Sequence, residues 1–106
     1  MSTTHTLPAE MTIYSATGLR TTFKQWLRKT SRRKRAGALP GKPLVVDAAL
    51  VVEIDAAGLQ LLIALSRSLA AEQRPLQLDR PSQALRTACS TLGLGEFLLG
   101  AAGEVP

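Results

Sequence analysis

The residues of this 106-residue chain that are best placed for chemistry form a short turn, from Asp55 to Gly58. Asp55 directly precedes an apolar helical stretch, so its carboxylate is predicted to cap that helix by accepting hydrogen bonds from the free amides of the first turn. Gly58 has no side chain and therefore permits close approach of another backbone segment. The amides of a helix N-terminus also favour an anion. The turn is a candidate binding site, although a plain helix cap explains Asp55 equally well.

Groups suited to nucleophilic catalysis or to metal binding are scarce. The chain has a single cysteine, Cys89, and a single histidine, His5. Cys89 falls on the core face of the last predicted helix, where a buried small hydrophobe is expected. One distal histidine makes a Ser-His-Asp triad improbable, and a zinc site needs about four ligands. We therefore expect a protein that is not an enzyme and that binds neither a metal nor a cofactor.

The formal charge of +5 is unevenly distributed. Nine Lys and Arg residues and no acid lie between Arg20 and Lys42, whereas all eight acids lie outside that window. Its densest part is typical of a solvated loop, but it is also a candidate contact for phosphate groups of nucleic acid or anionic lipid. No aromatic residue interleaves with this run, so base stacking has no platform. The candidate anion contacts are Arg32, Arg33, Lys34 and Arg35.

The length suits one domain over residues 1–106, with residues 1–10 partly frayed and residues 31–43 forming the basic loop. The longest apolar stretch runs from Ile54 to Leu65 and is interrupted by Asp55 and Gln60. It is too short and too polar to cross a bilayer. The first ten residues lack a basic start followed by an apolar run, so no secretory signal is predicted. These observations favour residence in the cytoplasm.

The elements that position the turn can be predicted from hydrophobic periodicity. The apolar run Leu44–Asp47 suits a central strand that is buried on both faces. In the helix after Asp55, leucines at positions 59, 62, 65 and 69 gather on one side, which is expected to cover the sheet. The predicted elements in chain order are a candidate strand over 4–7, a strand over 11–14, a helix over 16–30 capped by Ser15, a strand over 44–47, a segment over 51–54 leading into a helix over 56–73, a strand over 75–78, and a helix from the cap Ser82 to Gly93. This order predicts an α/β domain whose mixed sheet of four or five strands carries helices mainly on one face.

The stretch from Leu44 to Leu94 resembles the STAS domains of anti-sigma factor antagonists. The resemblance rests on Leu44–Asp47, Val52–Leu62 around Ile-Asp-Ala-Ala-Gly-Leu, Pro75–Leu78, Pro81–Arg86 and the closing Leu92-Gly93-Leu94. It covers about half of the chain closely and the N-terminal half loosely. In the family, the turn carries a Ser or Thr that a partner kinase phosphorylates. The corresponding positions here are Ala56 and Ala57, so no phosphorylation is expected at this turn.

The resemblance implies a STAS-like, non-catalytic regulatory module, an anti-anti-sigma factor, whose partner is an anti-sigma factor of the histidine-kinase-like ATPase type. Two alternatives stay open. One is the STAS accessory subunit of an ABC-type phospholipid transporter, which would bind the ATPase subunit, and the other is a basic nucleic-acid-binding module. A further open question is whether neighbouring helices cover Ile63 or leave it on a partner surface. The candidate partner-binding residues are Asp55, Ala56, Ala57, Gly58, Gln60, Ile63, Ala64 and Arg67.

Overall fold

A computed structural model of the chain describes residues 5–30 and 43–95. Its strands are β1 (His5–Thr6), β2 (Glu10–Met11), β3 (Leu44–Asp47), β4 (Glu53–Ile54) and β5 (Leu76–Asp79). Its helices are α1 (Ala16–Thr30), α2 (Ala56–Ala70) and α3 (Gln83–Thr91). The elements therefore alternate as an α/β domain should, and α2 begins directly after Asp55 as predicted.

The strands lie in two small sheets. One has the order β1-β3-β5 and the other pairs β2 with β4, and every pairing is parallel. The prediction of one mixed sheet is therefore wrong. The chain leaves the larger sheet after Leu7, whose N–H donates to the Asp47 carbonyl at 2.9 Å. Pro8 follows and has no N–H with which to continue the ladder.

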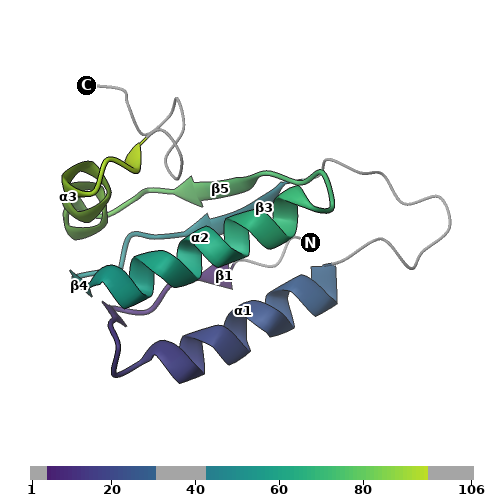
Figure 1. Ribbon diagram of the computed structural model, residues 1–106, viewed down its shortest axis with the longest axis horizontal. Helices are drawn as coiled ribbons and strands as arrows, with labels where there is room; N and C mark the ends of the chain where they lie inside the picture. The colour runs from purple at the N-terminus through teal and green to yellow at the C-terminus, as the bar shows by residue number, and fades with distance from the viewer. Residues whose placement is uncertain (1–4, 31–42, 96–106) are drawn as a thin grey trace, which may run out of the picture.

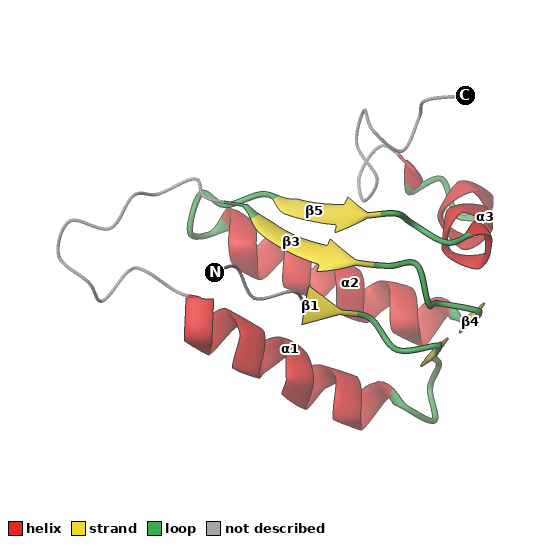
Figure 2. Ribbon diagram, turned by 180° about the vertical axis from the view of Figure 1, so that it is seen from behind, coloured by secondary structure: helices red, strands yellow, loops and turns green. Residues whose placement is uncertain are grey.

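Helices α1 and α2 cover one face of the larger sheet, and α3 lies beyond its end (Figure 1). Seen from behind, the strands lie in front of α2, and α1 lies alongside it below β1 (Figure 2). β3 is the central strand, as predicted, with Leu44 and Val46 buried. Val45 points away from this core and is 38% exposed, so the prediction that the strand is buried on both faces is wrong. An apolar run mimics a doubly covered strand, but here the described helices pack on one side only.

The core lies between the helices and the sheet, as the periodicity predicts. Leu59, Leu62, Leu65 and Leu69 of α2 are all buried. In α3, Leu85 and Cys89 are fully buried, which confirms Cys89 as a core residue. The Ser82 side chain caps α3 by accepting from the Leu85 N–H at 3.1 Å. Within the described ranges, no helix is long and apolar enough to cross a bilayer.

The predicted strand over 11–14 is wrong beyond Met11. Residues 12–15 form a tight turn in which the Ser15 N–H donates to the Thr12 carbonyl at 2.9 Å. The Thr12 N–H in turn donates to the Ser15 Oγ at 2.9 Å. Local bonds of this kind let Ser and Thr compete with strand pairing. As a result Ile13 and Tyr14, which alternation assigned to a strand, project from a loop. The Ser15 side chain also bonds back into this turn, donating to the Thr12 and Glu10 carbonyls, instead of capping α1 as predicted.

Candidate functional site

The carboxylate of Asp55 joins two segments that are distant in sequence. Its Oδ1 accepts from the Gly58 N–H at 3.1 Å, which is the predicted cap of α2. Its Oδ2 accepts from the Ile13 N–H at 3.0 Å, a bond across 42 positions. The Ile13 bond, followed by the Gly58 bond, lowers the pKa of Asp55 from its ordinary value. Asp55 is therefore more than a cap, because it also fixes the loop between β2 and α1 to the start of α2.

Gly58 provides the close approach that its lack of a side chain predicted. A Cβ placed on Gly58 would lie 2.1 Å from the carbonyl oxygen of Met11. That same carbonyl accepts from the Asp55 N–H at 3.2 Å. The β2 strand thus passes directly over the first turn of α2, and any larger residue at position 58 would force the two apart.

Two exposed apolar side chains lie beside this junction. Ile13 is 65% exposed and Tyr14 is 92% exposed, although the backbone of Ile13 is held by Asp55. Sequence reasoning missed both residues because their alternation suggested a strand. The remaining signal was local: Thr12 and Ser15 flank them at the spacing of a side-chain-stabilised turn. We refer to Ile13, Tyr14 and the Asp55–Gly58 turn together as the junction surface.

The outer side of α2 continues from the junction surface. Four of the candidate partner-binding residues are exposed there: Ala56, Gln60, Ala64 and Arg67. Ala57 is half-buried. Ile63, whose exposure the sequence left open, is also half-buried and packs against the core cluster, so only part of its side chain is open to a partner.

The N-terminus of α2 has little capacity for an external anion. The Asp55 carboxylate already occupies it and supplies the negative charge that the helix dipole favours. The other candidate anion contacts, Arg32 to Arg35, lie in 31–42, outside the described residues. Among the residues that the structure describes, no three His, Cys, Asp or Glu side chains gather in a way that could hold a metal ion. The arrangement is that of a hydrogen-bonded surface with exposed apolar groups.

Comparison with known families agrees with this geometry. A family model described as "Mlab, STAS domain" matches residues 6–100. The match extends over both halves of the chain, including the N-terminal half in which the sequence resemblance was loose. The chain belongs to the STAS domain family. A search of curated proteins gave no match.

Proposed function

We propose that this chain is a non-catalytic, cytoplasmic protein-binding module that acts as an anti-sigma factor antagonist through the junction surface and the outer side of α2. The observation that carries the proposal is the pair of hydrogen bonds that the Asp55 carboxylate accepts from the Ile13 and Gly58 N–H groups. These bonds hold the backbone that carries the exposed side chains of Ile13 and Tyr14 beside the α2 turn. A docking surface that is ordered before binding loses less entropy when the partner arrives.

The composition of the junction surface favours a protein partner. Tyrosine is enriched among the residues that contribute most to protein–protein binding, because it buries a large area and keeps a polar hydroxyl. Tyr14 is almost fully exposed and lies beside Ile13. Their exposure gives the folded chain no stability, whereas their burial against a partner would contribute about 25 cal/mol per Å² of apolar area.

The chemistry of the described residues supports a role without catalysis. The Cys89 thiol lies in the core, where desolvation raises its pKa and disfavours the nucleophilic thiolate. The His5 ring packs edge-on against Trp26, with ring centroids 4.9 Å apart, and burial lowers its pKa. Neither side chain belongs to the junction surface.

The alanines at positions 56 and 57 imply binding that is not switched by phosphorylation of this turn. Two nearby hydroxyls, those of Thr12 and Ser15, already donate to Glu10 and to backbone carbonyls. A partner that stays bound suits a permanent subunit better than a regulator that must be released. This observation favours the second candidate, the accessory subunit of an ABC-type phospholipid transporter, in which the same surface would bind the ATPase subunit.

Affinity capture from the native lysate tests the proposal when the wild-type chain is compared with Ala57→Asp. Ala84→Asp is a matched control, because Ala84 is the second residue of α3 and is also half-buried. An acid at either position is favoured by the helix N-terminus, so both variants should fold. We expect a protein that the wild type and Ala84→Asp retain and that Ala57→Asp loses.

The identity of the retained protein separates the candidates. A histidine-kinase-like ATPase supports the antagonist, and a transporter ATPase supports the accessory subunit. Retention of nucleic acid alone, lost at high salt, would support the third class instead. Equal capture by all three chains would contradict docking at this turn.

A further inference from the structure

The outer surfaces of α1 and α2 form a face that carries basic charge only. Neither helix contains an Asp or Glu residue. The exposed cations on it are Arg20, Lys24 and Arg28 of α1 and Arg67 of α2. We call these four residues the basic helical face. None of them takes part in an ion pair among the described residues, where the pairs formed are Arg74 with Glu72 and Arg80 with Asp47.

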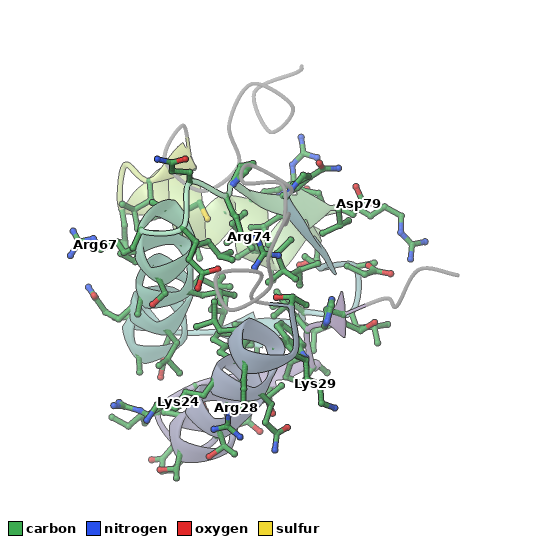
Figure 3. All side chains as sticks on the ribbon, turned by 90° about the vertical axis from the view of Figure 1, so that its right-hand side faces the viewer. Lys24, Arg28, Lys29, Arg67, Arg74 and Asp79 are labelled. Atoms are coloured by element: carbon green, nitrogen blue, oxygen red, sulfur yellow. The ribbon has the colours of Figure 1, made fainter. Side chains whose placement is uncertain are left out.

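The two helices present these cations to the same side of the molecule. α1 and α2 pack against each other in front of the sheet (Figure 1). Viewed along the molecule, Arg67 and Lys24 extend to the helical side, whereas Asp79 lies on the opposite side, beyond the open face of the sheet (Figure 3). Asp79 is thus kept away from Lys24 and Arg67, and no acid of α1 or α2 itself offsets their charge.

This arrangement works against helix stability. Arg20, Lys24 and Arg28 follow one another at intervals of four residues, so each is the nearest like charge to the next on the helix surface. Like charges at this spacing destabilise an isolated helix. Arg28, in the last turn of α1, is favoured by the negative end of the helix dipole, but the repulsion along the rest of the stripe is not offset by any acid of α1, which points to a use outside the fold.

We propose that the basic helical face binds an acidic surface of the protein partner, next to the junction surface. This inference rests on the proposed function and adds that the part of the partner facing the basic helical face is acidic. Acidic groups facing Arg20, Lys24 and Arg67 would speed association and fix the orientation of docking. The junction surface then anchors the complex by apolar contact, and the basic helical face aligns it.

The side chains of this face favour an acidic protein surface over an anionic membrane or a nucleic acid. Membrane docking of a helix needs large apolar side chains that insert beside the cations. The large exposed apolar residues of the described chain all lie outside α1 and α2. Binding to single-stranded nucleic acid without sequence preference combines cations with exposed aromatic platforms, whereas the aromatic residues of α1 pack inward with the core.

Site-specific cross-linking tests the inference. Because Cys89 is fully buried with a raised pKa, a cysteine placed on the surface can be labelled selectively with a benzophenone maleimide. Three full-length variants carry the label: Lys24→Cys on the basic helical face, Ala56→Cys on the junction surface, and Gln77→Cys on β5 as the control. Each is added to the native lysate and illuminated, and the joined peptides are identified by mass spectrometry.

We expect labelled Lys24→Cys and Ala56→Cys to cross-link to the same protein. The partner peptide that is cross-linked to position 24 should contain an excess of Asp and Glu. Gln77→Cys should not join that protein. A product at position 56 but none at position 24, or a position-24 product without excess acid, would overturn the inference and leave the proposed function standing. Products of position 24 with lipid, nucleic acid or a second copy of this chain would also overturn it. If neither position joins a protein, the proposed function itself fails.

Charge-reversal variants of this chain, titrated against the purified partner, test the inference quantitatively. Arg20→Glu should weaken binding at least tenfold at low salt, with a smaller loss at high salt. Arg86→Glu makes the same change near the start of α3 and should leave affinity within about twofold. Replacing the cross-linked partner acid by Arg should restore binding to Arg20→Glu. Equal losses for Arg20→Glu and Arg86→Glu would show an effect of net charge alone and would overturn the inference.

Discussion

The first turn of α2 is in contact with the β2 backbone at Gly58 and Met11, with no space for a side chain between them. A Cβ on Gly58 would lie 2.1 Å from the Met11 carbonyl oxygen and 2.9 Å from its carbon. The bond from the Asp55 N–H to the same carbonyl oxygen holds the two segments in this position. The geometry of the junction surface therefore depends on the absence of a side chain at Gly58, which is buried against Met11.

We predict that Gly58→Ala destabilises the fold by about 1–3 kcal/mol, because the added methyl group would overlap backbone that cannot rotate away. Gly18→Ala is the control: an added Cβ there would meet no atom within 4 Å beyond its chain neighbours and the backbone of α1 itself, and the change should stabilise by about 0.5–1 kcal/mol. Urea unfolding of both variants measures the effect. Equal stability of Gly58→Ala and the wild type would show that β2 does not lie over α2 as described.

We predict that Asp55→Ala lowers the melting temperature more than Ser82→Ala. Each change removes a side-chain cap from a helix, but only Asp55 also binds a distant segment through the Ile13 N–H. Hydrogen exchange should in addition show faster exchange of residues 12–15 in Asp55→Ala and unchanged exchange there in Ser82→Ala. Equal melting temperatures and unchanged exchange would mean that the Ile13 bond has no role in solution.

Acid should weaken the same junction. The pKa of Asp55 is lowered from its ordinary 3.8 by the bonds from the Ile13 and Gly58 backbones, so the ionised form is the one that stabilises the fold. This contribution is complete above the unfolded pKa and is lost as the pH falls through the lower folded pKa. Thermal melts at about pH 6 and about pH 3 should therefore show a smaller acid-induced loss for Asp55→Ala than for the wild type. Asp47 also has a lowered pKa, through the Ala49 N–H and Arg80, and this contribution should persist in both chains.

We predict that Ile63→Asp weakens partner binding by about 2 kcal/mol or more if the exposed part of Ile63 anchors the partner. Because Ile63 is half-buried, this variant should also lose some stability. That loss should be much smaller than for Leu62→Asp, which places a charge in a fully buried position. Partner titrations beside urea unfolding separate the two effects. Normal binding by Ile63→Asp would remove Ile63 from the partner-binding surface.

Local patterns predicted much of the scaffold. Leucine spacing identified the buried side of α2, and the cap types of Asp55 and Ser82 located the starts of α2 and α3. The exposed outer residues of α2, among them Gln60 and Arg67, followed from the same helical period. Each of these features is decided by residues within a few positions of each other, so each can be predicted from a local sequence pattern.

The features that were missed depend on distant contacts or on neighbouring layers. The bond from Ile13 to Asp55 links positions 42 apart, and no local pattern specifies such a pair. Alternation over 11–14 is shared by strands and by turns that expose apolar groups, so Tyr14 was assigned to the wrong environment. The exposure of Val45 depends on which side of the sheet the helices cover, which the strand sequence alone does not contain.

Docking through the junction surface is tested most directly by hydrogen–deuterium exchange of the full chain, alone and with its captured partner. Binding should slow exchange in two segments: residues 12–15, which carry Ile13 and Tyr14, and the start of α2 from Ala56 onward. Amides of β5 and α3 should exchange at the same rate in both states. Protection confined to β5 or α3, with residues 12–15 and α2 unchanged, would contradict docking through the junction surface.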